Sequence, residues 1–458
     1  MIAPRHIAVI DIGKTNAKLA LVDLSTLTEI AVVTRPNIVQ PGPPYPHYDV
    51  DGHWAFLLDA LATFHRDHRV DAISVTTHGA CAALLESSGT LAAPILDYEH
   101  TYPAEIIDAY EAIKPDFAQT GSPKLAGGLT IGAQLHWLFA TDHTLKGRTA
   151  QIVTYPQYWG HRLTGVTATD ITSIGCHTDL WNPYEGTFSE LPMKLDIADK
   201  IATVRRPSDI LGPILPQIAE ATGLAPDTPV CVGIHDSNAS LYPHVVSQGG
   251  PVSVVSTGTW VIVMSMKADG AIALDPTRDT LVNVNAREQA VASARFMGGR
   301  EYEVIQQGQP INPTDQDVMT VLERQTMLLP SIESGSGPFQ GRQIQWHGVE
   351  PDAGTGQRSA ALSFYLALMT GTCLNLVGGA GPTIVEGPFA RNPEYLAMLQ
   401  AVTTRSVLTN AAVTGTSIGA AMLFGDDEFP PELDQIDTAL PLDALRNYAD
   451  QWLVLADT

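Results

Sequence analysis

The chain has 458 residues, of which 45% are hydrophobic and 16% are charged, and its formal net charge is −23. This length predicts two large domains, and the composition is that of a globular protein. The acidity argues against nucleic acids and anionic membranes as partners, because both bind to a basic protein face. Four cysteines, Cys81, Cys176, Cys231 and Cys373, lie far apart, so we expect free thiols rather than disulfides or a zinc site.

Neither the N-terminus nor the most apolar segment has the pattern of a targeting or membrane sequence. The opening residues MIAPRHIAVIDIG run directly into a predicted strand and lack the basic and apolar regions of a signal peptide. The apolar stretch at 360–377 contains serine, threonine and asparagine, which indicates a buried helix rather than a membrane span. We therefore expect a cytoplasmic protein.

The predicted elements alternate between strands and helices in both halves of the chain. The first half is expected to hold a β-hairpin at 6–23, helices at 55–67 and 104–113, and strands at 72–76, 151–154 and 230–234. The second half repeats this order with a hairpin at 251–266, a strand at 383–385, and helices at 360–377, 394–403 and 417–424. This order predicts an α/β fold of parallel strands with helical crossovers, with ligands at the strand ends. We place the domain boundary near 240–250, giving domains 1–245 and 246–458.

The first motif is DIGKTN at residues 11–16, in the turn of the first hairpin. A turn with glycine exposes backbone N–H groups that can bind phosphate oxygens, and Lys14 and Thr15 add an ammonium and a hydroxyl. Asp11 can hold magnesium through water. An ordinary polar turn explains the same residues equally well, so this motif alone leaves both interpretations open. It is not a Walker A loop, because that sequence pattern is absent.

A second turn of this kind, STGTW, lies at residues 256–260 in the other predicted hairpin. One such turn is weak evidence for a phosphate site. Two of them, one in each half of the chain, predict that a triphosphate is bound from both domains.

The third motif, GIHDSNAS at 233–240, places Asp236 at the end of an apolar strand. Catalytic groups collect at strand ends in α/β folds, whereas a helix N-cap also explains an aspartate in this position. The two roles are compatible with each other.

The fourth motif, TTHGA at 76–80, also follows a strand. A single histidine is more often structural than functional. The position of His78 beside Gly79 at a strand end nevertheless favours contact with a substrate.

Taken in order, these segments resemble the FGGY carbohydrate kinases, within the superfamily of sugar kinases, heat-shock chaperones and actin. The resemblance covers almost the whole chain, through DIGKTNAKLALVD, HGACAAL, PILDYEH, QYWGHRLTGVTATDITS, GIHDSNASL, VSTGTW, and VEGPFARNPEYLAMLQAV with AAVTGTSIGAAM. It implies two actin-like, ribonuclease H-like α/β domains with a catalytic cleft between them. It also implies transfer of the γ-phosphoryl group of ATP, with Mg²⁺, to a sugar hydroxyl.

The resemblance implies roles for particular residues. Asp236 is expected to be the catalytic base, and Asp11 and Asp236 are expected to hold Mg²⁺. The expected sugar-binding residues are His78, Gly79, Glu99, Tyr158 and Asp236. The expected ATP-binding residues are Asp11, Gly13, Lys14, Thr15, Asn16, Lys18, Gly258, Thr259, Gly387, Pro388 and Arg391. The expected partners are a small sugar and ATP, and a homodimer is left open.

Three places depart from the family pattern. Lys14 stands where threonine or serine is commoner, and Asp97 replaces the usual tryptophan before the sugar-binding loop. The segment Glu386-Gly387-Pro388-Phe389 replaces the usual run of glycines at the adenosine site. The first and third departures affect nucleotide geometry, and the second affects the identity of the sugar. None of them removes Asp236.

The acceptor is expected to be a ketose. HDSNAS and STGTW resemble segments of rhamnulose kinases, which favours L-rhamnulose or L-fuculose, and Ala80, Ala82 and Ala83 could form an apolar wall for the methyl group of such a sugar. The segment around His78 resembles xylulose kinases more closely, so a pentulose such as xylulose or ribulose stays open, and FMGGR at 296–300 matches neither group. The alternatives from other classes are a catalytically silent sugar- or ATP-binding regulator and an actin-like ATPase.

Overall fold

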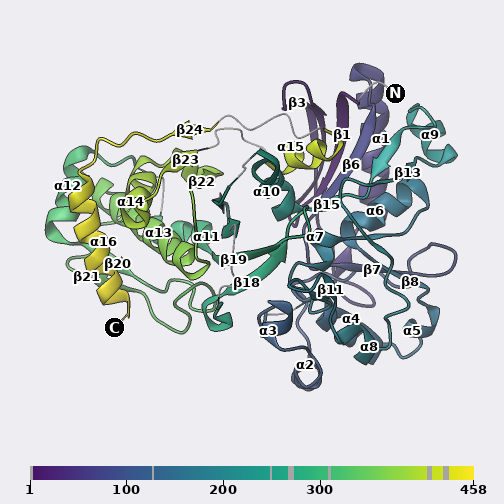
Figure 1. The fold of residues 1–458 in the computed structure, drawn as a ribbon, viewed down its shortest axis with the longest axis horizontal. Helices are drawn as coiled ribbons and strands as arrows, with labels where there is room; N and C mark the ends of the chain where they lie inside the picture. The colour runs from purple at the N-terminus through teal and green to yellow at the C-terminus, as the bar shows by residue number, and fades with distance from the viewer. Residues whose placement is uncertain are drawn as a thin grey trace. The chain divides into compact units, whose positions relative to one another are not determined.

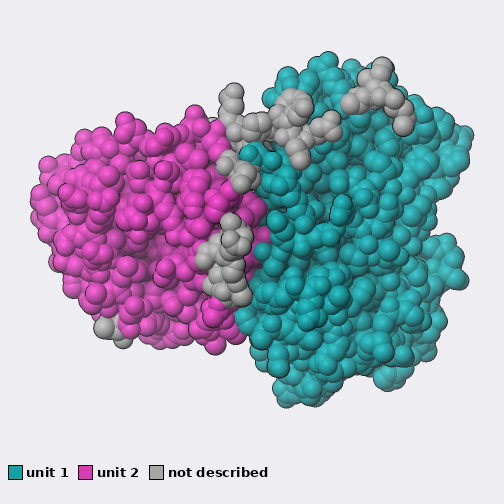
Figure 2. All heavy atoms as spheres, in the orientation of Figure 1, with its two compact units in different colours: residues 1–247, 282–290, 414–430 teal, residues 248–281, 291–413, 431–458 magenta. Residues whose placement is uncertain are grey.

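The computed structural model describes residues 4–125, 128–247, 250–266, 273–307, 311–409, 415–425 and 433–457. The chain forms two compact units, shown as a ribbon in Figure 1 and in two colours in Figure 2. Unit 1 contains residues 1–247, 282–290 and 414–430, and unit 2 contains residues 248–281, 291–413 and 431–458. The first unit thus includes two segments from later in the chain.

A mixed sheet forms the centre of unit 1 (Figure 1). Its strand order is β13-β14-β6-β1-β2-β3, and β15 also pairs with β6. The predicted first hairpin is confirmed, because β1 runs antiparallel to β2, and β1 also runs parallel to β6. The strands are β1 (His6–Ile12), β2 (Asn16–Asp23), β3 (Thr28–Pro36), β6 (Ala72–Thr77), β13 (Ile210–Pro213), β14 (Pro229–Cys231) and β15 (Ile234–His235).

Both faces of this sheet are covered, which explains why β1 has an almost continuous apolar sequence. Ala8 and Ile10 belong to a core that includes side chains of α1, α6 and α9, whereas Ile7 and Val9 belong to a core with α10 and α15. The helices of unit 1 are α1 (Val50–His68), α2 (Ala104–Glu111), α3 (Phe117–Thr120), α4 (Ile131–Thr141), α5 (Leu145–Arg148), α6 (Tyr155–Thr164), α7 (Ile171–Ile174), α8 (Leu191–Lys194), α9 (Pro216–Thr222), α10 (Asp236–Ser247) and α15 (Gly415–Ala421), followed by the 3₁₀ turn Met422–Phe424.

A second sheet, of order β18-β19-β17-β16-β22-β23-β24, repeats the same plan, and most of its strands belong to unit 2. An antiparallel hairpin, β16 with β17, is again followed by strands parallel to its first arm. The strands are β16 (Val252–Thr257), β17 (Val261–Met266), β18 (Thr280–Val284), β19 (Ala290–Phe296), β22 (Thr383–Glu386), β23 (Val407–Thr409) and β24 (Asp434–Gln435). The helices are α11 (Gly298–Gln306), α12 (Asp315–Arg324), α13 (Gly356–Leu376), α14 (Pro393–Thr403) and α16 (Leu442–Asp457), with 3₁₀ turns at Pro276–Arg278 and Pro388–Arg391. The repeated plan confirms the predicted α/β class with an actin-like sheet in each unit.

The prediction of parallel strands with helical crossovers does not hold for every strand. The predicted strand at 151–154 is β8 (Gln151–Thr154), which pairs antiparallel with β7 (Ala82–Leu85) outside the central sheet. Other two-stranded sheets join β4 (Val39–Gln40) to β5 (His47–Tyr48), β9 (Thr169–Asp170) to β12 (Val204–Arg205), β10 (Trp181–Asn182) to β11 (Thr187–Phe188), and β20 (Met327–Leu329) to β21 (Gln345–His347).

The long apolar helix lies in the core of unit 2, as predicted. Within the described part of the chain, α13 is the one helix long and apolar enough to span a membrane, but 83% of its most apolar stretch is buried in the fold. It begins four residues earlier than expected, because the Thr355 side chain accepts a hydrogen bond from the N–H of Arg358 and caps the helix. All four cysteines are buried and free, which also matches the prediction.

Candidate active site

Three parallel strands of unit 1 end side by side, and each carries a predicted site segment. Ile12 of β1 is level with Thr77 of β6, and Thr77 is level with His235 of β15. The N–H of His78 donates to the carbonyl oxygen of Ile12 at 2.9 Å. The first turn, His78 and Asp236 therefore leave the sheet at one edge, where α/β folds carry their ligands.

The first turn is held by two residues that the sequence did not identify. The Gly13 N–H donates to the Asn16 carbonyl at 2.9 Å, which closes the turn. The backbone N–H of Asn37 donates to the Thr15 carbonyl at 2.8 Å, and its side-chain amide donates to the Gly13 carbonyl at 2.8 Å. His53 Nε2 lies 2.8 Å from the Asn37 side-chain oxygen. Asn37 and His53 thus fix the shape of a turn whose outer residues are exposed.

Asp11, near the end of β1 and just before this turn, lies in a cluster of charged side chains. Lys18 Nζ is 3.2 Å from the Asp11 carboxylate and 3.4 Å from that of Glu29. Burial raises the pKa of Asp11, Lys18 opposes this shift, and the nearby carboxylate of Asp236 adds to it. Lys18 is therefore paired with acidic side chains in this structure, and its expected contact with ATP stays a prediction.

Asp236 is the first residue of α10, with 34% of its side chain exposed. Its carboxylate accepts a 2.6 Å hydrogen bond from the N–H of Ser237 and lies 3.2 Å from Nε2 of His235. Burial raises the pKa of Asp236, whereas His78 and the Ser237 hydrogen bonds lower it. A carboxylate that is accessible and has a raised proton affinity suits a general base.

The segment TATDITS at 167–173, in which no site residue was predicted, holds the backbone next to Asp236 through hydrogen bonds. The N–H of His235 donates to the Thr172 hydroxyl oxygen at 3.0 Å, and that hydroxyl donates to Asp170. Burial raises the pKa of Asp170 to about 6. Gly79 lies against the ring of His235. A Cβ atom at residue 79 would be only 2.6 Å from His235 Nε2, so this position requires glycine.

His78 lies among aromatic rings on the predicted sugar side. The centroid of its ring is 5.0 to 5.2 Å from those of Tyr48, Tyr98 and Tyr155. Burial lowers the pKa of His78 to about 4, so the ring is neutral at physiological pH. Nδ1 lies 2.8 Å from the Gly79 carbonyl oxygen, and Nε2 is buried with no hydrogen-bond partner among the described residues.

Glu99 and Lys14 meet beside this aromatic group. Lys14 Nζ is 3.1 Å from the Glu99 carboxylate and also contacts the Asp97 carboxylate. The backbone of Lys14 belongs to the first turn, but its side chain reaches the segment PILDYEH at 94–100, the predicted sugar loop that contains Asp97 and Glu99.

Tyr158 does not join the sugar-side group. Its hydroxyl accepts a 3.3 Å hydrogen bond from Arg162, and its ring contacts Trp159. Tyr155, the first residue of α6, contacts His78 instead. Tyr155 was not singled out from the sequence, because helical periodicity alone does not say which turn of α6 borders the strand ends. The expected role of Tyr158 in binding the sugar stays a prediction.

Unit 2 brings the second turn and the predicted adenosine segment together. Ser256 of β16 is level with Glu386 of the parallel strand β22, so the residues that follow both strands are neighbours. The Thr257 hydroxyl donates to the Glu386 carbonyl at 2.5 Å and accepts from the N–H of Phe389 at 3.1 Å. The predicted residues at this edge are all exposed, and they are Gly258, Thr259, Gly387, Pro388 and Arg391.

The FMGGR segment also belongs to this edge of unit 2. The N–H of Gly299 donates to the Thr259 carbonyl at 3.2 Å, and a Cβ atom on Gly299 would lie 2.1 Å from the Gly258 carbonyl oxygen. Gly298 is the first residue of α11, so the amino end of this helix borders the turn. Helix amino ends favour anions, which fits a phosphate site at this turn. The two glycines of FMGGR are the signal in the sequence for this part of the site, although no role was predicted for them.

The residues present fit a magnesium ion held largely by phosphate and water. Mg²⁺ prefers oxygen ligands and keeps several waters, so one or two carboxylates are enough. Asp11 and Asp236 provide such carboxylates, and both lie at the ends of strands that pair with β6. Within the described ranges no group of three or more His, Cys, Asp or Glu side chains forms a metal site.

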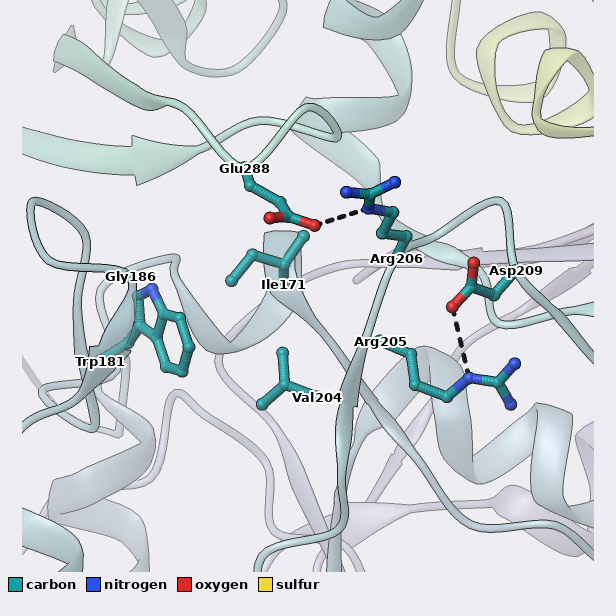
Figure 3. A pocket seen from close by; sticks show the side chains of 8 residues that line it. All are labelled: Ile171, Trp181, Gly186, Val204, Arg205, Arg206, Asp209 and Glu288. Carbon is teal, nitrogen blue, oxygen red and sulfur yellow. Dashed lines mark hydrogen bonds and ion pairs between the residues drawn. The ribbon is translucent and has the colours of Figure 1, made fainter.

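A separate pocket of about 530 Å³ lies in unit 1 and includes none of the predicted site residues (Figure 3). Arg206 Nε is 2.7 Å from the Glu288 carboxylate, and Arg205 Nε is 3.4 Å from that of Asp209. Each arginine of this pocket is thus already paired. The lining residues are Ile171, Trp181, Gly186, Val204, Arg205, Arg206, Asp209 and Glu288.

Comparison with known proteins agrees with this arrangement. A carbohydrate kinase from Novosphingobium aromaticivorans has a similar structure, with a TM-score of 0.89 and 34% sequence identity over 100% of this chain and 99% of that one. A xylulose kinase from Lactobacillus acidophilus shares the fold, with a TM-score of 0.80 and 16% identity over 99% of this chain and 98% of that one.

An L-fuculokinase from Salmonella typhi is 26% identical over 266 residues, which is 56% of each protein, so the match spans little more than half of that relative. Residues 6–242 match the N-terminal domain of the FGGY family of carbohydrate kinases, and residues 249–432 match a carbohydrate kinase FGGY C-terminal domain. The chain therefore belongs to the FGGY family of carbohydrate kinases.

Proposed function

We propose that the protein transfers the γ-phosphoryl group of ATP to a hydroxyl of a ketose. One observation carries the proposal most: the partly exposed carboxylate of Asp236 lies at a strand end, near the neutral ring of His78 and its aromatic neighbours. Carboxylates beside aromatic faces suit a sugar, which presents both hydroxyls and apolar C–H groups. Membership of the FGGY family supports the same activity.

In this mechanism Asp236 acts as the general base. The acceptor hydroxyl attacks the γ-phosphorus as its proton passes to the Asp236 carboxylate, a new O–P bond forms, and the bond to ADP breaks. Such transfers depend mainly on positioning and on stabilising charge, so rigid phosphate turns matter more than covalent chemistry. Asp11 and Asp236 would hold Mg²⁺, which offsets the negative charge of the phosphates when it is bound.

The remaining predicted residues divide between the two ligands. Residues 1–245 would supply the sugar site, the first phosphate turn and Asp236, and residues 246–458 would supply the second turn and the adenosine site. Gly13, Thr15 and Asn16 would meet the phosphates from one turn, and Gly258 and Thr259 from the other. Gly387, Pro388 and Arg391 would border the nucleoside. A cytoplasmic location and a homodimer stay predictions.

We place 6-deoxy ketohexoses, L-rhamnulose or L-fuculose, ahead of the pentuloses xylulose and ribulose. The HDSNAS and STGTW segments support this order, and so do the L-fuculokinases that match part of the chain. A missing methyl group changes discrimination by only about 1–3 kcal/mol, so pentuloses should be poorer substrates rather than inert ones. The alternatives are a pentulose kinase and a silent sugar- or ATP-binding regulator.

A coupled ADP-release assay tests the proposal. Purified protein with Mg²⁺ and ATP is compared on L-rhamnulose, L-fuculose, D-xylulose, L-ribulose and glycerol. We expect the highest kcat/KM for a 6-deoxy ketohexose. Glycerol as the best substrate by tenfold or more would exclude a ketose kinase, and ATP turnover that no sugar stimulates would favour the regulator.

A further inference from the structure

The Lys14 side chain leaves the first phosphate turn and ends among residues of the predicted sugar loop. Its ammonium contacts the carboxylates of Asp97 and Glu99, the latter at 3.1 Å. It also lies 4.7 Å from the ring centroid of Tyr98 and 5.6 Å from that of Tyr48, within the range of a cation–π contact. An ammonium with four such neighbours is fixed in place, and all four lie on the sugar side.

Lys14 and Asp97 are two of the positions where the chain departs from the family pattern, and in the structure these two side chains contact each other. Asp97 is buried and also accepts a 3.0 Å hydrogen bond from the Tyr48 hydroxyl. A buried carboxylate without a cation is strongly unfavourable, and so is a lysine held among rings without an anion. The two departures therefore compensate each other and form one unit.

Two lysines of this region are already paired with carboxylates. Lys14 bridges Asp97 and Glu99, and Lys18 bridges Asp11 and Glu29. Asp236 adds a further carboxylate at the same edge of the sheet, since His235, just before it, is level with Thr77, just before His78. A sugar acid that entered here would meet like charges and would have to displace an existing ion pair.

His78 provides a second, independent indication of the ligand's chemistry. Its Nδ1 lies 2.8 Å from the Gly79 carbonyl oxygen, which can only accept, so Nδ1 carries the proton and Nε2 is an acceptor. Nε2 is buried and has no partner among the residues that the structure describes. A sugar hydroxyl can donate to Nε2 and to the carboxylates of Asp97 and Glu99, whereas a sugar carboxylate can donate to none of them.

We infer that the Lys14–Asp97 pair, together with Glu99, determines specificity by selecting uncharged sugars and excluding sugar acids. Lys14 acts as a positioning residue that holds both carboxylates as hydrogen-bond acceptors for sugar hydroxyls. This inference rests on the proposed function and names its substrate class. It also separates Lys14 from the phosphates, although its backbone belongs to the phosphate turn.

The test uses the full chain with Lys14→Met, Asp97→Asn and the double variant, and Lys194→Met as a control that removes the exposed Lys194–Glu190 pair. KM for the best ketose and for ATP are measured separately, and ketose binding without nucleotide is measured by calorimetry. Each single variant should raise the ketose KM at least about tenfold and change the ATP KM less than about twofold, and the double variant should be much less than additive. Lys194→Met should match the wild type.

A second arm compares wild-type binding and turnover of L-rhamnulose or D-xylulose with those of D-gluconate. We expect gluconate to be at least about a hundredfold poorer, because like charges brought together suppress wrong partners strongly.

Equal use of gluconate, or an increase confined to the ATP KM in Lys14→Met, would overturn the inference and leave the kinase proposal standing. Ketose binding that the variants weaken, without phosphorylation by the wild type, would instead refute the kinase proposal alone. A wild type that binds no ketose, with or without nucleotide, would refute both the inference and the proposed ketose kinase. If Lys14→Met does not fold, Lys14→Arg and Asp97→Asn carry the same comparison.

Discussion

Gly387 lies so close to Thr257 that a Cβ atom on it would come within 2.0 Å of the Thr257 carbonyl oxygen. Its φ angle is +82°, which an L side chain rarely adopts. We predict that Gly387→Ala pushes the adenosine segment away from the second turn. The ATP KM should rise at least about tenfold while sugar binding stays close to the wild type.

The matched control is Gly341→Ala, at φ +80° in the same unit but with no atom within 4 Å of the added Cβ. It keeps the backbone strain and removes the steric clash. Steady-state kinetics with ATP and calorimetry with the sugar distinguish the two variants. Equal ATP KM values in both would show that the close approach at Thr257 does not shape the nucleotide site.

Local patterns predicted the fold and the strand-end residues, because these depend on short stretches of sequence. Each Gly-Thr turn closes a hairpin of neighbouring residues, and each apolar strand ends where its polar residues begin. The residues that complete the site come from distant segments. Lys14 meets Asp97 across 83 positions, and Asn37 reaches back to Gly13 across 24. The pattern of a short stretch of sequence does not indicate such pairings, because the two partners come together only when the chain folds.

The second prediction concerns the base. Asp236→Asn removes the proton acceptor and keeps the shape of the side chain, so turnover should fall at least about a hundredfold. The ATP KM should change little, since the carboxylate acts on the acceptor. Asp199→Asn, at an exposed position, is the control. Near-normal turnover of the Asp236 variant at saturating sugar would show that another group takes the proton.

The third prediction concerns His53, which supports the first turn through Asn37. Its Nε2–H donates to the Asn37 oxygen, and its Nδ1, 2.7 Å from an Arg35 nitrogen, must accept from that guanidinium. Burial, with a smaller effect from Arg35, lowers the pKa of His53 to about 4. The unfolded chain binds this proton near pH 6.5, so the folded state loses stability as the pH falls below 6.5, and this effect is absent above pH 7.

Between pH 7.5 and 5.0 this single group should reduce the free energy of unfolding by about 2 kcal/mol. Urea unfolding at both pH values checks the prediction. His53→Gln, whose side chain does not titrate, should lose correspondingly less stability on acidification than the wild type. His143→Gln, at an exposed position, should behave like the wild type. An identical pH dependence in wild type and His53→Gln would contradict the assignment.

The last prediction links helix packing to catalysis. Gly419 of α15 faces α10, where a Cβ atom on it would come within 1.8 Å of the Ala239 carbonyl oxygen and 3.1 Å of Pro243. The two helices also share a 3.0 Å hydrogen bond between the hydroxyls of Ser240 and Thr416. Gly419→Ala must therefore separate them. Overpacking of this kind destabilises a fold by about 1–3 kcal/mol.

Because Asp236 is the first residue of α10, this separation should also move the carboxylate. We expect Gly419→Ala to lower both the melting temperature and kcat, and a 1 Å displacement of a reacting group is enough for a loss of about a hundredfold. Gly147→Ala is the control, since Gly147 lies in α5 with no atom within 4 Å of the added Cβ. Thermal unfolding and steady-state kinetics on both variants decide the question. A Gly419 variant that loses stability but keeps its kcat would show that the position of Asp236 does not depend on the contact between α10 and α15.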